Sequence, residues 1–456
     1  MVTSDAQDVD RAPDGGGGSE SVQVSRSELR TVLLSTVVGT TVEWYDFFLY
    51  GVAAGIVFNK LYFPSEDPVV GTLLAFATFA VGFVARPFGG LIFGHIGDRV
   101  GRKKTLIATM MIMGVATFLI GVLPTYASIG VAAPILLVVL RLAQGIAIGG
   151  EWGGAVLMST EYAPPGRKGL FGSVPQMGLA IGLLLGTGVF SILTWVTSEE
   201  AFLAWGWRIA FGLSAVLVLV GLYIRLKVME TPAFRKLEKE EEKAAVPVLE
   251  LVRSRVNRKH LWLGMGARWV EGLAFNTWAV FSIAYGTGTL GLSESTMLTA
   301  VMLAAVVLVV LIPVFGKLSD RFTRRTTYAW GTVAMVVMTG ISFEMLNSGN
   351  TVVVIMAVVL SLGVVYPMMY GPVAAFFTEL FPANVRYTGI SIVYQLSGIF
   401  ASGLTPLILT WLLARAGGDL GYVRWYFLAI GLLSLVCTLA IRPKDLVDDH
   451  AVEESA

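Results

Sequence analysis

The sequence predicts an all-α integral membrane protein with twelve transmembrane helices in two six-helix halves and both termini in the cytoplasm. Three observations support this fold class. The first is composition: 55% of the 456 residues are hydrophobic and only 14% are charged, whereas about 25% of residues are charged in an average soluble domain. The second is a series of long apolar windows, and the third is an internal repeat. Together they argue against an ordinary soluble enzyme.

Apolar windows of membrane-crossing length follow one another along the chain. A helix needs about 20 mostly apolar residues to cross the hydrocarbon layer of a bilayer. Charged or turn residues separate twelve such windows, at 32–58, 69–95, 105–123, 131–158, 169–195, 206–226, 260–285, 296–316, 327–346, 351–378, 387–413 and 422–441. We therefore expect twelve helical spans rather than a β-barrel, whose strands appear as short segments of alternating polarity.

The distribution of Lys and Arg agrees with twelve spans. In membrane proteins the loops on the cytoplasmic side carry an excess of these residues. With the amino terminus inside, 26 of the 33 Lys and Arg residues fall on or near the inner face. Four fall outside, and three lie within predicted spans: Arg86, Arg141 and Arg268. We therefore expect a multi-pass protein of the cell membrane (an inner or plasma membrane) with both termini in the cytoplasm.

The domain organisation follows from the polar and charged stretches between the spans. Residues 1–30 are polar, contain four consecutive glycines and lack the pattern of a signal peptide, so we expect a disordered cytoplasmic tail. The charged segment 227–257 is the expected cytoplasmic linker between an N-terminal half, 31–226, and a C-terminal half, 258–442. Residues 443–456 form a second predicted cytoplasmic tail.

An internal repeat supports the two halves. The stretch 94–103 returns in weaker form as 316–325, and Glu161 with Arg167 returns as Glu379 with Arg386. Two motifs at nearly one offset indicate duplicated six-helix units, which is how many secondary transporters are built around a midplane site. Glycines allow the sharp turn between two helices, and the charged residues can pair with neighbouring helix ends. We expect gating or structural roles for Gly94, Gly97, Asp98, Arg99, Gly101, Arg102, Asp320, Arg321, Glu161, Arg167, Glu379 and Arg386.

Several function classes are excluded or disfavoured by the composition. The net charge of +1 gives no reason to expect nucleic-acid binding. A single cysteine, Cys437, excludes a disulfide within the chain and a cysteine-based metal site. The sequence contains neither an H-E-x-x-H nor a G-x-S-x-G motif. We therefore expect no enzyme activity, no metal and no cofactor, and the sequence carries no sign of a particular oligomeric state.

The motifs resemble those of a known transporter family. The stretch 94–103 and its second copy resemble the signature of the major facilitator superfamily, and 141–145 resembles that superfamily's fourth-helix motif. The stretches 43–47, 85–90, 149–154 and 205–208 look like the metabolite:proton symporter branch. This resemblance covers about residues 30–442 and implies the major facilitator fold. Members of the branch transport α-ketoglutarate, citrate, shikimate, or proline and betaine. Some osmosensing members have a long cytoplasmic coiled-coil tail, and we do not expect one after the last predicted span here.

Acidic residues inside predicted spans are the candidates for proton coupling. An ionisable group in a span costs several kcal/mol unless it faces protein or water. Glu43 and Asp46 are three residues apart and share one face of the first span. Neighbouring carboxylates hinder each other's ionisation, which leaves a group able to exchange protons. Glu151, among four glycines, is a second candidate. A structural ion pair is the alternative for Glu43 and Glu151.

Arginines inside the spans are candidates for binding a carboxylate. Arg141 is the leading one, either as the counter-ion of Asp46 or as a bidentate ligand of a substrate carboxylate. Arg268 and Glu271 are substrate-site candidates, although their spacing of three residues also lets them neutralise each other. For Arg86, near the inner end of the second span, we expect snorkelling to the interface or a local pair.

Polar and aromatic side chains complete the predicted cavity. The substrate-binding candidates among them are Tyr45, Gln144, Gln176, Asn276, Tyr370 and Tyr394. Tyr50, Trp278 and Gln395 are further expected lining residues. Pro175, Pro367 and Pro372 can bend spans five and ten, which frees backbone groups for protein or water partners.

These features, with the resemblance, predict a secondary active transporter in the lipid bilayer. We expect proton-coupled uptake of a small organic acid, such as shikimate or a dicarboxylate, by alternating access between the two halves. The alternative is a symporter for a zwitterionic osmolyte such as proline or betaine. An exporter or a membrane sensor is a more distant alternative.

Overall fold

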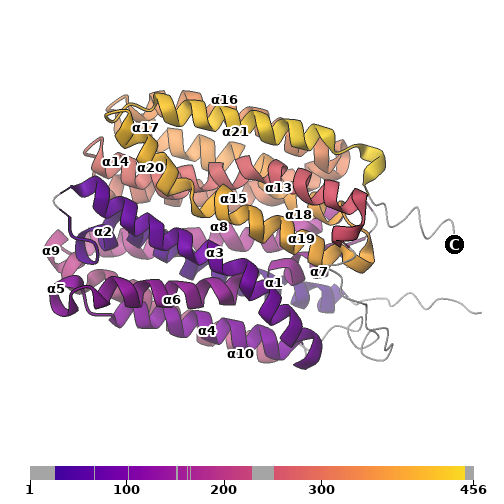
Figure 1. Ribbon diagram of the computed structural model, residues 1–456, viewed down its shortest axis with the longest axis horizontal. Coiled ribbons are helices and arrows are strands. Elements are labelled where there is room, and N and C mark those ends of the chain that lie inside the picture. The colour runs from indigo at the N-terminus through magenta and orange to yellow at the C-terminus, as the bar shows by residue number, and fades with distance from the viewer. Residues whose placement is uncertain are drawn as a thin grey trace, which may run out of the picture.

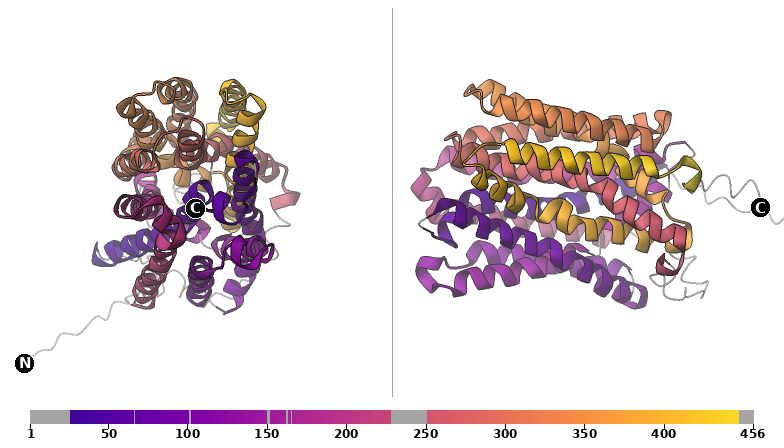
Figure 2. Two further views of the ribbon diagram at one scale, coloured as in Figure 1. Left: turned by 90° about the vertical axis from the view of Figure 1, so that its left-hand side faces the viewer. Right: turned by 45° about the horizontal axis from the view of Figure 1, so that its top comes forward.

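The computed structural model describes residues 26–65, 67–100, 102–149, 152–161, 163–164, 166–227 and 251–446. Within these ranges the regular elements are helices and none is a strand. The long helices run side by side along the long axis of the molecule (Figure 1). Helices of the first half, coloured indigo to magenta, lie mostly below those of the second half, coloured rose-red through orange to yellow. Figure 2 shows this division end-on.

Helices of the first half run from Arg26 to Lys227. They are α1 (Arg26–Ala53), the π-helical turn η1 (Ala54–Phe58), α2 (Asn59–Leu61), α3 (Pro68–Val100), α4 (Arg102–Val122), α5 (Tyr126–Ile129), α6 (Ala132–Gly149), α7 (Trp152–Glu161), α8 (Lys168–Val196), α9 (Glu199–Ala201), η2 (Phe202–Gly206) and α10 (Trp207–Lys227). Since α1 begins at Arg26, helix starts inside the segment 1–30 that the composition predicted as a tail.

Helices of the second half run from Arg255 to Ala440. They are α13 (Arg255–Asn276), η3 (Thr277–Phe281), α14 (Ser282–Gly288), α15 (Glu294–Phe322), α16 (Arg324–Leu346), α17 (Thr351–Val358), η4 (Val359–Val365), α18 (Pro367–Thr378), α19 (Ala383–Gly398), η5 (Ile399–Gly403), α20 (Thr405–Arg415) and α21 (Gly421–Ala440). A short 3-10 turn, η6 (Pro443–Asp445), follows. Most of the predicted linker, residues 228–250, lies outside the described residues.

Nine helices among the described residues are long and apolar enough to cross a membrane. They occupy nine of the predicted windows, from Pro68–Phe93 to Gly421–Ala440. The other three windows, 32–58, 105–123 and 260–285, coincide with helical segments 26–61, 102–122 and 255–288. Helical structure at these windows is confirmed, while membrane crossing by the last three stays a prediction. Pro175 and Pro372 lie inside α8 and α18, and Pro367 begins α18 directly after η4.

Glycines set the distance between α3 and α6. A Cβ atom at Gly89 would lie 1.9 Å from the carbonyl oxygen of Ile146, and one at Gly149 would lie 1.9 Å from that of Arg86. A Cβ at Gly145 would lie 2.1 Å from the carbonyl oxygen of Gly82. Small residues allow such backbone contact between membrane helices. Gly89 and Gly149 therefore have a packing role, which fixes where Arg86 sits.

The two halves meet along α8 and α15, which lie side by side (Figure 1). A Cβ at Gly169 of α8 would lie 2.5 Å from the carbonyl oxygen of Gly316 in α15. We call the end of the bundle that contains these two glycines, together with the motif copies 94–103 and 316–325, the motif end. The end that contains α2, α5, α9 and α14 is the far end.

Replacing Gly149 by alanine is expected to destabilise the first half. The added methyl group collides with the Arg86 carbonyl, and overpacking costs about 1–3 kcal/mol or more. Gly149→Ala should lower the melting temperature of the purified protein in detergent. Gly212→Ala in α10 is the matched control, because a Cβ there meets no atom within 4 Å. Equal melting temperatures for the two variants would contradict the role of this contact.

Candidate functional site

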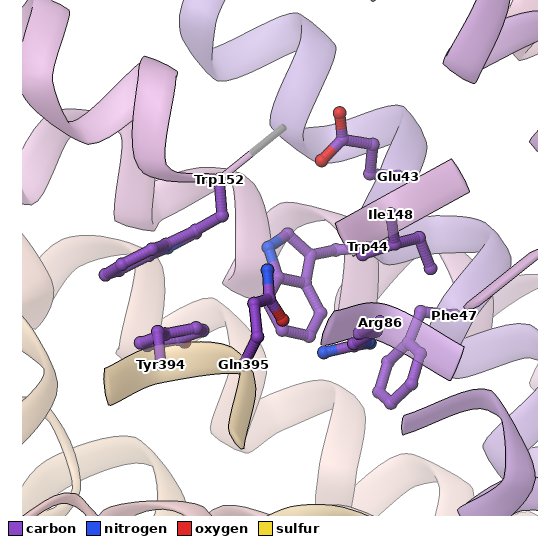
Figure 3. Close-up of a pocket in the computed structure, with 8 residues that line it drawn as sticks. All are labelled: Glu43, Trp44, Phe47, Arg86, Ile148, Trp152, Tyr394 and Gln395. Carbon is purple, nitrogen blue, oxygen red and sulfur yellow. The ribbon is translucent and has the colours of Figure 1, made fainter. Parts of the chain in front are cut away.

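A small cavity lies between the two halves (Figure 3). Its lining comes from α1, α3, α6 and α7 of the first half and from α19 of the second half. The space open to the centre of a water molecule is about 10 Å³, which is about what one water needs. The cavity is therefore contracted in this conformation. The lining residues are Glu43, Trp44, Phe47, Arg86, Ile148, Trp152, Tyr394 and Gln395.

Arg86 is a buried cation that faces this cavity. Its side chain lies over aromatic rings, 4.1 Å from the centroid of Phe83 and 4.7 Å from that of Phe47. The residue is 3% exposed, and its Nε and Nη2 atoms have no hydrogen-bond partner within the described ranges. Ring faces offset part of the cost of burying a guanidinium, but its N–H groups still need acceptors. The site is therefore suited to an anion.

The expectation that Arg86 snorkels to the interface is wrong. Backbone contact between Gly149 and the Arg86 carbonyl holds this part of α3 against α6, and the side chain lies inside the bundle. The sequence pointed to Arg86 only as an arginine within an apolar, glycine-flanked stretch. Trp152 was also not identified from the sequence as a cavity-lining residue, because its glycine neighbours indicated only close helix packing.

An aromatic stack joins the two halves beside the cavity. The ring centroids of Trp152 and Tyr394 are 3.6 Å apart, with an interplanar angle of 14°. Gln395 donates from Nε2 to the carbonyl oxygen of Gly149 at 3.1 Å, which is a second link between the halves. Trp152 also donates from its indole nitrogen to Gln176 Oε1 at 3.3 Å. The structure thus brings predicted residues Tyr394 and Gln176 next to the cavity.

Asp46 is buried away from this cavity, and the described residues place no cation in an ion pair with it. It is 1% exposed and accepts a short hydrogen bond from Ser214 of α10. Its Oδ2 atom has no hydrogen-bond partner among the residues that the structure describes. Glu43, three residues earlier, lines the cavity. The two carboxylates therefore have different surroundings, although they share a helix.

Arg141 does not pair with Asp46, which was one of the two roles that the sequence allowed for it. Its Nη1 donates to Gln144 at 3.0 Å, and its guanidinium lies 4.2 Å from the ring centroid of Tyr50. Gln144 in turn donates to Thr117 at 2.7 Å. Gly82 makes room for this arrangement, since a Cβ there would lie 2.5 Å from Arg141 Nε. Packing against α3 thus turns Arg141 toward aromatic rings.

Arg268 and Glu271 form the ion pair that their spacing predicts. Arg268 Nε lies 3.5 Å from Glu271 Oε2, and both side chains are 3% exposed. Tyr366 donates a short hydrogen bond to Glu271, and Arg268 donates to Ser397 at 3.0 Å. The Arg268 guanidinium lies 3.6 Å from the ring centroid of Tyr394. Because Trp152 stacks on Tyr394 at the same separation, the two neighbours must occupy opposite faces of that ring.

Three other predicted substrate ligands lie in the protein interior outside the cavity lining. The Tyr45 hydroxyl donates to the Ala210 carbonyl at 2.8 Å, which ties α1 to α10. Asn276 donates to the Gly272 carbonyl of its own helix at 2.9 Å. Tyr370 stacks on Tyr366 with ring centroids 5.2 Å apart. Glu151 lies outside the described residues.

Asp320 closes the motif end across the two halves. Its carboxylate oxygens accept from the backbone N–H groups of Gly169 at 2.7 Å and Leu170 at 2.9 Å. These groups lie in the first turn of α8, where the helix dipole favours a negative charge. Arg324 donates to Asp320 at 3.1 Å and pairs with Glu379 at 3.1 Å. One carboxylate of the second half therefore caps a helix of the first half.

The other predicted motif residues with described side chains are exposed at the surface or make contacts within their own half. Arg167 and Arg321 are exposed, and Arg386 is buried and donates to the Phe381 carbonyl at 3.0 Å. Glu379 pairs with Arg324 of the same half. Gly94, Gly97, Asp98 and Arg99 lie in α3, Arg102 begins α4 and Glu161 ends α7, but their side chains lie outside the described part, as does Gly101 entirely.

The fold and the cavity define a class of protein. Two helical halves that enclose a charged cavity at their interface are the architecture of secondary transporters. The family model of the Major Facilitator Superfamily matches residues 36–402 and 287–455. The chain belongs to this superfamily, among its metabolite transporters. It is a multi-pass membrane protein, and its relatives are transporters rather than enzymes.

Named relatives cover most of the chain. The inner membrane metabolite transport protein YhjE of Escherichia coli is 40% identical over 90% of this chain and 93% of its own. The shikimate transporter of the same organism is 39% identical over 92% and 96%. The proline/betaine transporter of Salmonella typhimurium is 34% identical over 92% and 84%. A D-xylose-proton symporter structure has the same fold, with a TM-score of 0.71, 17% identity and coverage of 91% and 98%.

Replacing Asp320 by alanine is expected to open the motif end. The change removes the acceptor of two backbone N–H groups and of Arg324, and a charged hydrogen bond is worth about 1.5–3 kcal/mol. We expect Ser173→Cys, in a Cys437→Ser background, to react with a maleimide about fivefold faster or more in the Asp320→Ala variant. Ser173 is buried beside Gly316.

The matched control for this experiment is Arg321→Ala. Arg321 is the neighbouring residue of the same motif, but its side chain is exposed. Its removal should leave the labelling rate unchanged. Equal rates in the Asp320→Ala variant and in the unmodified background would show that Asp320 does not hold the motif end closed.

Proposed function

We propose that the protein is a proton-coupled symporter that takes up a small organic acid by alternating access. The observation that carries this proposal is Arg86, which is buried, lies over aromatic rings and has guanidinium N–H groups without acceptors at a cavity shared by both halves. A substrate carboxylate supplies those acceptors in a bidentate geometry that suits guanidinium. The printed name of the shikimate transporter, at 39% identity, supports an organic acid.

The described conformation corresponds to an occluded state of the transport cycle. Asp320 and the Trp152–Tyr394 stack join the halves at the motif end and beside the cavity. At the far end, Lys60 of the first half pairs with Glu294 of the second half at 3.5 Å. The cavity is too small for a metabolite when both ends are closed. The excess of Lys and Arg assigns the motif end to the cytoplasm, with twelve spans and both termini on that side.

Asp46 is the proposed proton carrier. An ionised carboxylate that is buried without a cation costs several kcal/mol, whereas a protonated one does not. Ser214 contributes one hydrogen bond, and none of the described cations forms an ion pair with Asp46. Glu271, in contrast, keeps Arg268 as its counter-ion. Proton exchange at Asp46 therefore changes the net charge of the first half, which biases the reorientation of the loaded carrier.

A zwitterionic osmolyte is the second candidate substrate. Trp44 and Trp152 line the cavity with aromatic rings, and Glu43 is the carboxylate in its lining. Aromatic faces attract quaternary ammonium groups, while Arg86 suits the carboxylate of such a molecule. The 34% identity to a proline/betaine transporter supports this alternative.

Replacing Asp46 by asparagine is expected to uncouple transport from protons. The variant keeps the shape of the side chain and an acceptor for Ser214 but cannot exchange a proton. We expect uptake driven by an inward pH gradient into proteoliposomes to be lost, while exchange of internal for external substrate persists. Asp419→Asn is the control, since Asp419 is exposed in a loop. The assignment of Asp46 as the proton carrier would be overturned if substrate accumulation were independent of the pH gradient in both the unmodified protein and the Asp46→Asn variant.

Replacing Arg86 by glutamine is expected to weaken binding of organic acids. Loss of charged hydrogen bonds worth about 1.5–3 kcal/mol corresponds to about a 10- to 100-fold rise in the dissociation constant. A panel of acids is tested by the rise in melting temperature that each produces, because a ligand of the native state stabilises it. Arg415→Gln, at an exposed arginine near Trp411, should respond like the unmodified protein. An unchanged response of Arg86→Gln would rule out Arg86 as the anion ligand.

A further inference from the structure

We propose that a groove on the outer surface of the second half binds one acyl chain of a bilayer phospholipid. The groove lies between α16 and the junction of η4 with α18, and it shares no lining residue with the cavity between the halves. The space open to the centre of a water molecule is about 500 Å³. The wall that α16 contributes consists of Trp330, Val333, Ala334, Val337 and Met338.

The spacing of these residues explains why they form one wall. Positions 330, 333, 334, 337 and 338 recur at intervals of three and four residues, so they share one face of a helix. That face is apolar and exposed, since 65% of Trp330 and 59% of Val337 are accessible. Because α16 is among the helices that are long and apolar enough to cross a membrane, this face meets the hydrocarbon of the bilayer.

Small residues and an irregular backbone create the hollow. A Cβ atom at Gly331 would lie 2.9 Å from the Cβ of Met368, so α16 and α18 are in direct contact there. Ala334, three residues further along, has only a methyl group to fill the space beside this contact. On the opposite wall, η4 is a π-helical turn and Pro367 begins α18 just beyond it. Helices commonly bend at such features.

The lining specifies an apolar occupant. Among the described residues that line the groove, none is charged, and the indole N–H of Trp330 is the one side-chain hydrogen-bond donor. A carboxylate or a zwitterion would find no partners there. A hydrocarbon chain needs none, and it gains dispersion contacts with the groove walls that it does not make with a flat helix surface.

The length and direction of the groove also fit an acyl chain. At a rise of 1.5 Å per residue, the wall from Trp330 to Met338 is about 12 Å long. Trp330 is the wall residue nearest to the start of α16 at Arg324, which follows the motif copy at the motif end. Tryptophan side chains gather at the membrane interface. The groove therefore runs from the interface toward the midplane, as an acyl chain does below its headgroup.

A second copy of this chain is the alternative occupant. Stable protein–protein interfaces use about 20–30 residues on each side, whereas seven residues line the groove. A narrow hollow of this kind suits a flexible chain better than a flat protein surface. The lining therefore favours a lipid.

The groove lies directly behind the charge pair of the second half. Val365 and Met368 line it, and between them in the chain is Tyr366, which is fully buried and donates to Glu271. An acyl chain in the groove therefore supports the backbone segment that presents Tyr366 to Glu271. We expect the bound phospholipid to stabilise the folded protein, since a ligand of the native state raises its stability.

The test is photolabelling of the full-length protein by a phospholipid. The protein is reconstituted into vesicles of phosphatidylethanolamine and phosphatidylglycerol that contain some phosphatidylethanolamine with a diazirine in its acyl chain. It is then extracted in detergent, freed of unbound lipid and irradiated, and the labelled residues are identified by mass spectrometry. We expect Val333 and Val337 to be labelled about tenfold more than Val310 and Val314. Those two valines of α15 are exposed but lie outside the groove lining.

A variant that fills the groove provides the second measurement. Ala334→Phe places a ring in the hollow and should lower the labelling of Val333 and Val337 about tenfold. Added phospholipid should raise its melting temperature less than that of the unmodified protein. Ala108→Phe is the matched control, because Ala108 is an exposed alanine of α4 outside the groove lining, and it should respond like the unmodified protein.

The outcomes do not depend on which substrate is transported, so they are independent of the proposed function. Equal labelling of the four valines would mean ordinary contact with the bilayer and would overturn the inference. A disulfide-linked dimer of Val337→Cys in a Cys437→Ser background, without labelling of the groove, would replace the lipid by a second copy. If Ala334→Phe does not fold, the labelling pattern of the unmodified protein still decides.

Discussion

The cost of leaving a charged group inside an apolar bundle without a partner governs this structure. Arg268 and Glu271 reduce this cost by pairing with each other. For Arg141 the cost is reduced by a hydrogen bond to one amide and by the faces of several rings. Within the part of the chain that the structure describes, Asp46 has hydroxyl neighbours and no cation, and Arg86 has rings and unfilled N–H groups. The last two are therefore the places where protonation or a ligand changes the energy most.

Close backbone contact makes these environments possible. Glycines at the crossing of α3 and α6 bring the two helices together and leave the Arg86 side chain inside the bundle. The same device joins Gly169 to Gly316 at the motif end, where Asp320 caps α8. Packing at van der Waals distance is the main attractive force between helices in a bilayer. The glycines thus determine where Arg86 and Asp320 lie, and Asp320 helps to hold the two halves together.

The two halves have diverged around their shared architecture. In the first half, the buried carboxylate Asp46 and the buried cation Arg141 are apart and have separate partners. In the second half, Glu271 and Arg268 are paired, and Arg268 lies against Tyr394. Tyr394 in turn carries Trp152 of the first half on its other face. A rearrangement of the Arg268–Glu271 pair would therefore act directly on Tyr394, and through it on the Trp152–Tyr394 contact between the halves.

Local features of the chain predicted the helical membrane class and the presence of Asp46, Arg141, Arg268 and Glu271 within helices of the bundle. Composition and helical spacing determine these properties, and the spacing of three residues was sufficient for the Arg268–Glu271 pair. Tertiary packing alone decided that Arg86 rather than Arg141 faces the cavity, that Asp46 meets Ser214 across 168 residues, and that Asp320 caps α8. The physical reason is that periodicity specifies which residues share a helix face, whereas partners on distant helices depend on how closely those helices approach.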